Sequence, residues 1–429
     1  MRQRDQPAGQ VASGVGPIVS ATSMVDAHPW RFAFLLLAAL WAVLAITGFL
    51  ASQAGPREPV GGSWEELVYS GPLASFVSYW QRWDALWYQQ IAQNGYAAGN
   101  GTAAFFPLYP LLSRIASILF AGNVLLGELA VSAAASVGAI TLLWRLVDVE
   151  SGGRAARAWV LPFVATPRLS FSLKALTVLL TVLFPVGFVL LAPYTESLFL
   201  LFTVATLLLA RTGHPWLAGL MGLLAGLTRI QGVFLALPIA YEYLSDRQTW
   251  AWIRRQGGRA PGLGLLAATL PAVGLAIVTA FQWLVIGERR SGLDLQSIWG
   301  LKVALPWDVL AASWAYMAGG AHNDSFAFVE AFNAACLLGA VAIVIAGARR
   351  LPVAYTLYAL PSLGLLSFRE MYFSPLMSVG RYVLVVFPVF MIAASWLAPR
   401  PKIAAAILIV SGLLELVFFQ YWVRWGFVA

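Results

Sequence analysis

The sequence predicts an all-α polytopic membrane protein, and two observations carry the prediction. Hydrophobic residues make up 60% of the 429 residues and charged residues only 11%, which is outside the range of ordinary soluble domains. Apolar segments also recur from Trp30 to Val423 with short polar interruptions. Because a hydrocarbon core of about 30 Å needs roughly 20 apolar residues per helix, we expect about ten to twelve transmembrane helices.

The positive charge of the chain does not indicate a nucleic-acid-binding protein. The formal net charge is +8, but the Lys and Arg residues are divided among short loops and form no single basic face. In membrane proteins, basic loops of this kind set the orientation of the helices. The single cysteine, Cys336, excludes an internal disulfide framework.

The N-terminal segment differs from the rest of the chain. Residues 1–30 are polar and contain no early apolar core of the signal-peptide type, so we expect a mobile cytoplasmic tail. Residues 31–429 should then form one transmembrane domain. Arg2, Arg4 and Arg31 precede the first span, residues 31–51, and the positive-inside rule therefore places the next loop, about 53–104, outside.

This first external loop contains the stretch RWDALWYQQIAQNGY, residues 82–96. Its spacing predicts an amphipathic helix on the membrane surface. Asp84 and Tyr88 share one edge of the apolar stripe, whereas Arg82 should point away from it. The stripe consists of Phe76, Trp80, Trp83, Trp87 and Ile91.

The next segment leaves two topologies open. AFFPLYPLLSR, residues 104–114, carries Pro107 and Pro110 and predicts a kinked helix near the outer surface. Residues 124–146 form a clear span, followed by Arg154 and other basic residues that are typical of a cytoplasmic loop. If residues 104–121 cross the bilayer, that basic loop lies outside; if they dip in and return, it lies inside.

Two polar interruptions divide the central part of the chain. PRLSFSLK, residues 167–174, predicts an interfacial piece before a span at 175–192, and PYTESLFLLF then places Glu196 at the mouth of the span 197–211. Residues 216–244 carry Arg229 at their centre, which favours two half-helices that meet at TRIQG, residues 228–232. Broken helices are tolerated where they line a cavity.

The remaining chain predicts alternating spans and turns. Residues 287–326 form the second long polar loop, which should be external, and FREMYFSPLMSVGRY, residues 368–382, forms a short external turn. The expected spans are 263–286, 327–347, 351–367, 383–398 and 403–423.

Four charged residues recur at the same predicted face: Asp84, Glu196, Arg229 and Arg381. A charge at membrane depth costs several kcal/mol and usually faces a cavity or a partner, so their coincidence favours one extracytoplasmic pocket. The arginines suit a lipid phosphate, and Tyr382 could add a hydroxyl donor. The alternatives are an interfacial carboxylate for Asp84, helix capping for Glu196 and structural Arg–Glu pairs.

The sequence carries no phosphate-binding glycine loop, no metal-ligand cluster and no serine or cysteine nucleophile motif. His322 is therefore expected to be a solvated loop residue, and we expect neither a metal nor another cofactor. Chemistry at the outer face without a nucleotide implies an activated group carried by a lipid. A carboxylate among aromatic rings then fits glycosyl transfer, with Asp84 as base for the acceptor hydroxyl.

Several segments together resemble one known family, the PIG-V family of mannosyltransferases, which includes the second mannosyltransferase of GPI-anchor assembly and bacterial relatives. The resemblance covers roughly residues 75–400 and implies a GT-C glycosyltransferase fold, a catalytic aspartate at Asp84, a polyprenyl-phosphate-mannose donor and inversion at the anomeric carbon. The matching segments, in order, are RWDALWYQQIAQNGY, AFFPLYPLLSR, PYTESLFLLF, LTRIQG and VGRYVLVVFPVF.

The chain departs from the family pattern at three places. The family often has a glutamate where this chain has Gly99-Asn100, continues the arginine motif with Ser-Asn-Gly where this chain has Ile230-Gln231-Gly232, and has a proline where this chain has Gly380. These departures bear on the acceptor and the sugar more than on the reaction class.

Two functions follow as hypotheses. The first is a glycosyltransferase of a bacterial plasma membrane that acts on a glycan, lipid or protein acceptor at the extracytoplasmic face, with Trp83, Trp87, Tyr88 and Glu196 shaping the pocket. The second is a transporter or lipid flippase, motivated by broken helices and charges at membrane depth. One external pocket with Asp84 near Arg229 or Arg381 favours the enzyme, whereas a polar path from face to face favours transport.

Overall fold

The computed structural model describes residues 28–55, 68, 70, 71, 73–152, 172–245, 250, 253–255, 262–290, 295–319 and 324–428. The predictions for residues 1–27, for Arg154, for residues 167–171 and for His322 lie outside these ranges. The described chain is mostly helical, in agreement with the predicted helical membrane protein.

Within the described ranges, five helices are long and apolar enough to cross a bilayer. They are α2 (Pro29–Gln53), α6 (Val124–Gly152), the continuous segment Leu263–Ile286, Phe326–Gly347 within α16 (Asp324–Gly347), and α20 (Pro401–Val423). The segment Leu263–Ile286 is built from the 3₁₀ turn η7 (Leu263–Thr269), α13 (Leu270–Phe281) and the π turn η8 (Gln282–Ile286). The larger number of ten to twelve spans stays a prediction.

Shorter helices fill the space between these spans. The apolar ones are α5 (Leu108–Ser117), α8 (Leu173–Val182), α10 (Pro215–Gly226), α11 (Ala236–Leu244), α17 (Val353–Ser367) and α19 (Pro388–Leu397). The others are α3 (Ala74–Val77), α4 (Asp84–Asn94), α9 (Glu196–Arg211), α15 (Pro306–Ala318) and α18 (Val379–Leu384). Further 3₁₀ turns are η2 (Ser78–Trp80), η3 (Thr102–Ala104), η4 (Ile118–Phe120), η5 (Gly187–Leu190), η6 (Ile230–Leu235) and η9 (Gln296–Trp299).

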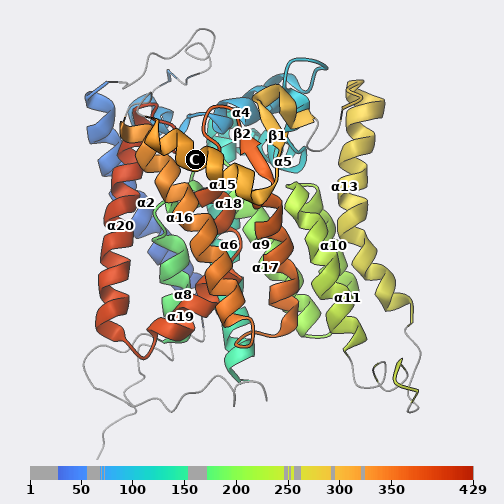
Figure 1. The fold of residues 1–429 in the computed structure, drawn as a ribbon. Coiled ribbons are helices and arrows are strands. Elements are labelled where there is room, and N and C mark those ends of the chain that lie inside the picture. Colours follow the sequence, from blue (N-terminus) through green and yellow to red (C-terminus); the bar gives the residue numbers. More distant parts are fainter. Residues whose placement is uncertain are drawn as a thin grey trace, which may run out of the picture.

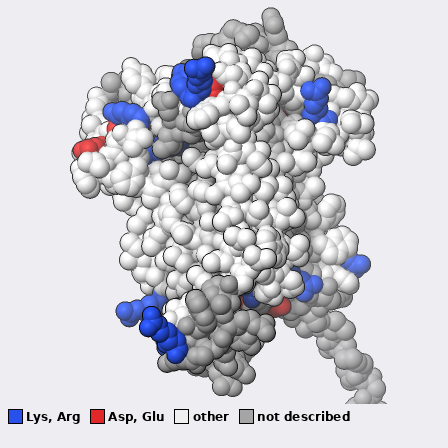
Figure 2. Space-filling model, turned by 90° about the vertical axis from the view of Figure 1, so that its right-hand side faces the viewer, with Lys and Arg blue, Asp and Glu red and all other residues white. Residues whose placement is uncertain are grey.

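The helical body has two distinct ends. Figure 1 shows α4, α5, α15 and the two short strands together at one end, which we call the α4 end, and α19 and the lower part of α11 at the opposite end. On the face drawn in Figure 2, charged side chains lie near these two ends and uncharged side chains cover the band between them. This distribution is typical of a protein embedded in a bilayer.

The structure favours a dip for residues 104–121. The helix Leu108–Phe120 is about 20 Å long at about 1.5 Å per residue, too short for a core of about 30 Å. Ala121 and Gly122 then adopt positive φ values of 53° and 83° and turn the chain back into α6. The two helices pack closely, since a Cβ at Gly127 would lie 2.5 Å from the Ser113 carbonyl oxygen.

The predicted surface helix through Trp80 and Trp87 is broken, which corrects the sequence analysis. The chain turns at Trp83, where φ is +54°, and α4 begins only at Asp84. Arg82 does not point into solvent: it is buried, its Nε donates to the Val423 carbonyl over 2.7 Å, and its guanidinium lies over the Trp425 ring. The C-terminal end of α20 therefore fixes the start of α4.

The predicted break at residues 228–232 is present. Helix α10 ends at Gly226, Arg229 has an extended backbone, and η6 begins at Ile230. A Cβ at Gly232 would lie 2.5 Å from the backbone of Ala225, so the two half-helices meet where only glycine fits.

Two strands join the two predicted external segments. Strands β1 (Leu301–Val303) and β2 (Arg369–Met371) pair antiparallel, with Val303 opposite Arg369. This ribbon is a small departure from an all-helical fold. It connects residues 287–326 to the turn that contains the arginine at position 369.

Candidate functional site

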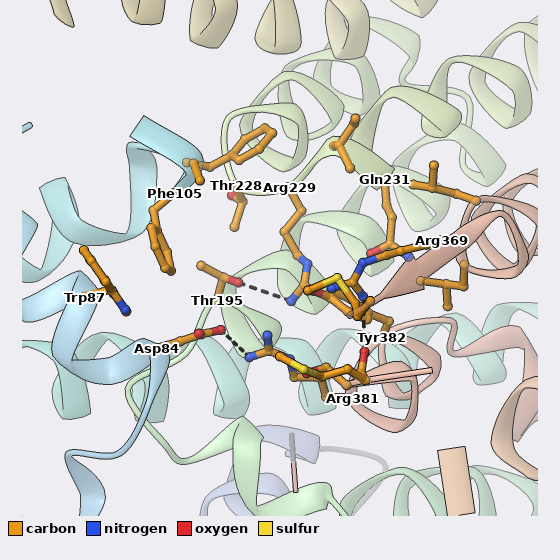
Figure 3. Close-up of a pocket in the computed structure, with 18 of the residues that line it drawn as sticks. Asp84, Trp87, Phe105, Thr195, Thr228, Arg229, Gln231, Arg369, Arg381 and Tyr382 are labelled. Atoms are coloured by element: carbon orange, nitrogen blue, oxygen red, sulfur yellow. Dashed lines mark hydrogen bonds and ion pairs between the residues drawn. The ribbon is translucent and has the colours of Figure 1, made fainter. Parts of the chain in front are cut away.

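A pocket at the α4 end gathers charged and aromatic side chains from distant parts of the chain. The space within it and at its open mouth amounts to about 1130 Å³. Figure 3 shows Asp84 and Trp87 on one side, with Arg229, Gln231 and Arg369 on the other. The lining comes from α4, the segment before α5, Thr195 before α9, the break around residue 229, the α17–β2 region, the turn before α18, α18 itself and Phe427 after α20.

Asp84 is the first residue of α4 and is held in place by an arginine. Its Oδ2 lies 2.6 Å from Arg381 Nη1, and its side chain remains 26% exposed. The position at a helix N-terminus also favours a negative charge. Asp84 is therefore fixed in orientation and still accessible to a molecule in the pocket.

Glu196 lies behind the pocket wall between two guanidinium groups. It is the first residue of α9 and is fully buried. Its Oε1 lies 2.5 Å from Arg229 Nη1 and 3.6 Å from Arg381 Nε. Arg229 Nη1 also donates to Thr195 Oγ1 over 3.2 Å. The structural Arg–Glu pair considered from the sequence is thus present, within the wall of the pocket.

Tyr382 lies among three arginines. The Cζ atoms of Arg229, Arg369 and Arg381 lie 4.5, 4.9 and 5.2 Å from the centroid of its ring. Such contacts between guanidinium groups and a ring are favourable, more so when they are shielded from water. The ring therefore holds together a cluster of like charges that would otherwise repel one another.

Aromatic side chains of α4 form the opposite wall. Trp87 stacks on Phe105 with ring centroids 5.6 Å apart, and Tyr88 contacts Phe105 and Tyr109 edge to face. Burial, helped by the nearby carboxylates of Asp84 and Glu196, raises the pKa of Tyr88 above its ordinary value. Its hydroxyl therefore stays neutral and can donate a hydrogen bond.

Most of the residues predicted for the site do meet there. Six of the eight line the pocket: Asp84, Trp87, Tyr88, Arg229, Arg381 and Tyr382. Glu196 contacts the arginines from behind.

Trp83 does not line the pocket, in contrast to its expected role. Its ring packs against Trp425 and Phe427, with centroids 5.9 and 5.1 Å away. Its ring contacts one lining residue, Phe427, and its backbone turn precedes Asp84 at the start of α4.

Among the lining residues that the sequence analysis did not single out, three are notable for their polar side chains: Gln231, Arg369 and Ser378. Each carries a buried polar atom without a hydrogen-bond partner. Gln231 belongs to TRIQG, and the other two belong to the turn 368–382, so both segments were recognised, but only their neighbouring arginines were singled out. Within the described ranges, no group of three or more His, Cys, Asp or Glu residues could hold a metal ion.

Comparison with known proteins adds no further information on the site. No protein-family model, no curated protein and no solved structure matches this chain.

Proposed function

We propose that the protein is a membrane glycosyltransferase with a GT-C fold, which moves mannose from a polyprenyl-phosphate-mannose donor to an acceptor hydroxyl on the extracytoplasmic side. The observation that carries the proposal is the pocket in which the accessible carboxylate of Asp84 faces a cluster of three guanidinium groups. This pocket belongs to a protein with several membrane-spanning helices. A lipid-linked donor fits such a place because its reactive phosphate sits at the membrane boundary.

The groups in the pocket match the needs of an inverting transfer. The acceptor oxygen attacks the anomeric carbon from the face opposite the phosphate and gives its proton to Asp84, which acts as general base. The bond between the anomeric carbon and the phosphate oxygen breaks, and the electron pair leaves with the phosphate. A guanidinium group of the cluster stabilises the charge that develops there. The stacked rings of Trp87 and Phe105 offer a flat apolar wall for the sugar.

Transport of a glycolipid remains the alternative function. A transporter with this many helices is often built from inverted repeats, and the sequence carries no sharp internal repeat. The contact between Asp84 and Arg381 within one pocket is the arrangement that favours an enzyme.

The test is transfer of labelled mannose from a polyprenyl-phosphate-mannose donor in membranes that contain the full chain. Asp84→Asn keeps the shape of the side chain but cannot accept the proton, so we expect the rate to fall by about 100-fold or more. Asp148→Asn, near the end of α6, is the matched control and should transfer at the wild-type rate, because its side chain is 51% exposed and, among the described residues, forms an ion pair with Lys174 alone.

Each other outcome is informative. If the Asp84→Asn protein is as active as wild type, Asp84 is not the general base. If the wild-type protein transfers no mannose but moves a labelled polyprenyl-phosphate lipid between leaflets, the protein is a transporter and not a glycosyltransferase.

A further inference from the structure

The pocket contains one more positive charge than negative charges. Its ionic groups are the guanidinium groups of Arg229, Arg369 and Arg381 and the carboxylates of Asp84 and Glu196. Asp84 contacts Arg381 and Glu196 contacts Arg229, at 2.6 and 2.5 Å. Two of the three arginines are therefore already balanced by carboxylates, and the excess charge belongs to Arg369.

Arg369 is held in place but incompletely satisfied. It opens β2, opposite Val303 of β1, so its backbone is fixed by the ribbon. Its Nη1 donates to the Met377 carbonyl over a long 3.3 Å, whereas its buried Nε has no hydrogen-bond partner. Burial lowers the pKa of Arg369 below its ordinary value, and the charges of Arg381 and Arg229 lower it further. An anion at this place would relieve both effects.

Two neutral residues present further unused polar atoms to the same pocket. Gln231 is 2% exposed, and neither its Nε2 nor its Oε1 has a partner. Ser378 is 1% exposed, and its Oγ has no partner either. Ser378 also adopts a φ of +64°, where glycine would be relaxed, so the chain accepts backbone strain and keeps a hydroxyl at this position.

Buried polar atoms without a partner are rare in native proteins because each one costs free energy. Here Arg369 Nε, Gln231 Nε2 and Ser378 Oγ are found together as lining groups of one pocket with an excess positive charge. All three can donate hydrogen bonds to oxygen. Arg381 Nε also lacks a hydrogen-bond partner, but it lies 3.6 Å from Glu196 Oε1. Figure 3 shows the Gln231 and Arg369 side chains reaching into the same part of the pocket.

We infer that Arg369, Gln231 and Ser378 form the binding site for a singly charged phosphate group, and that Arg229 and Arg381 instead position the two carboxylates. A phosphodiester carries one negative charge and would balance the excess cation. The inference rests on the proposed function in one respect, which is that the phosphate belongs to an isoprenyl lipid. It differs from the expectation drawn from the sequence, which assigned phosphate binding to Arg229 and Arg381.

Binding of farnesyl phosphate to the purified full chain in detergent tests the inference, with tryptophan fluorescence as readout. The measurement is made near pH 5, where a phosphomonoester, with a second pKa of about 6, carries about one negative charge, as a phosphodiester does. Farnesol, which lacks the phosphate, and inorganic phosphate, which lacks the lipid, are the comparison ligands. Arg369→Gln should weaken binding of farnesyl phosphate by about tenfold or more, because a charge-assisted contact is lost, and leave farnesol binding unchanged. Arg400→Gln, the same substitution at the opposite end, should bind like wild type, since Arg400 lies outside the pocket and its Nη1 donates to the Trp396 carbonyl.

A second variant covers the case in which Arg369→Gln does not fold. Ser378→Gly removes the hydroxyl and at the same time relieves the positive φ, so it should fold well and weaken binding of farnesyl phosphate by about threefold to tenfold. Wild-type affinity for farnesyl phosphate in both variants would overturn the inference. Equal wild-type affinities for farnesyl phosphate and farnesol would do the same. Equal affinities for farnesyl phosphate and inorganic phosphate would remove the lipid and leave a site for free phosphate.

The failure of this inference can be told apart from the failure of the proposed function. If Arg369→Gln loses phosphate binding but the wild-type protein transfers no sugar, the phosphate site is supported and the proposed glycosyl transfer is contradicted. If the wild-type protein transfers mannose, and Arg369→Gln binds farnesyl phosphate and transfers mannose like wild type, the proposed enzyme is supported and this phosphate site is contradicted.

Discussion

Two ionic clusters lie at the two ends of α9 and differ in how completely their polar atoms are paired. At the last residue of the helix, Arg211 donates to Glu150 over 2.7 and 3.1 Å and to Glu242 over 3.0 and 3.1 Å. Tyr355 donates to the same Glu150 oxygen that receives Arg211 Nε, over 2.8 Å. These contacts join the ends of α6, α9 and α11 to the start of α17.

The cluster at the first residue of α9 is built from the same residue types but leaves several polar atoms unused. Glu196 contacts two arginines there, while Arg369, Gln231 and Ser378 keep buried polar atoms without partners. A fully paired cluster stabilises the contacts between helices, whereas an incompletely paired cluster around an open pocket is prepared for a ligand. The fraction of polar atoms that have hydrogen-bond or ion-pair partners therefore distinguishes a structural cluster from a binding site better than the number of charges does.

The largest effect on stability is expected from Arg211→Met. This change leaves Glu150 and Glu242 without their shared cation, so we expect the free energy of unfolding to fall by about 3–5 kcal/mol. Denaturant unfolding in detergent measures it, and folded protein should still bind farnesyl phosphate like wild type. Arg400→Met is the control and should change stability little. Unchanged stability in Arg211→Met would contradict the stabilising role of the Arg211 cluster.

A smaller loss is expected from Tyr355→Phe. The hydroxyl of Tyr355 donates to a charged acceptor, and its removal should lower the free energy of unfolding by about 1.5–3 kcal/mol. Tyr358→Phe is the matched control: this tyrosine is also fully buried but donates to the neutral Val385 carbonyl, so its loss should cost about 0.5–1.5 kcal/mol. A larger loss for Tyr358→Phe than for Tyr355→Phe would contradict the structural role of the ionic cluster.

The smallest effect, with the opposite sign, is expected from Gln231→Met. The buried amide has no partner, so an apolar side chain of similar length should leave the stability unchanged or raise it by up to about 1 kcal/mol. Affinity for farnesyl phosphate should fall at the same time. In the control Gln282→Met, the lost amide donates to the Ala103 carbonyl, so stability should decrease. If both substitutions lower the free energy of unfolding equally, the missing hydrogen-bond partners of Gln231 do not cost the protein stability.

The sequence predicts features whose cause is local. The spans follow from runs of apolar residues, and the break at TRIQG follows from an arginine in the middle of such a run. The meeting of Asp84 with Arg381 could be predicted from topology, since both were assigned to the same face of the bilayer.

Features that depend on distant parts of the chain could not be predicted. Arg82 is buried because the carbonyl of Val423 and the ring of Trp425, more than 300 residues later in the sequence, replace its water. No local pattern contains that contact. The position of Arg369 in the pocket could not be predicted either, because it depends on the pairing of β2 with β1.

The length of α9 bears on how a substrate reaches the pocket. The helix has 16 residues, which makes it about 24 Å long, whereas the hydrocarbon layer is about 30 Å thick. The helix alone is therefore shorter than this layer, and any tilt shortens its reach further. If the Arg211 end lies at one boundary of the layer, Glu196 at the other end lies about 6 Å inside the opposite boundary. In the function proposed above, a lipid-anchored donor would then reach this end from the side, by lateral diffusion within the membrane.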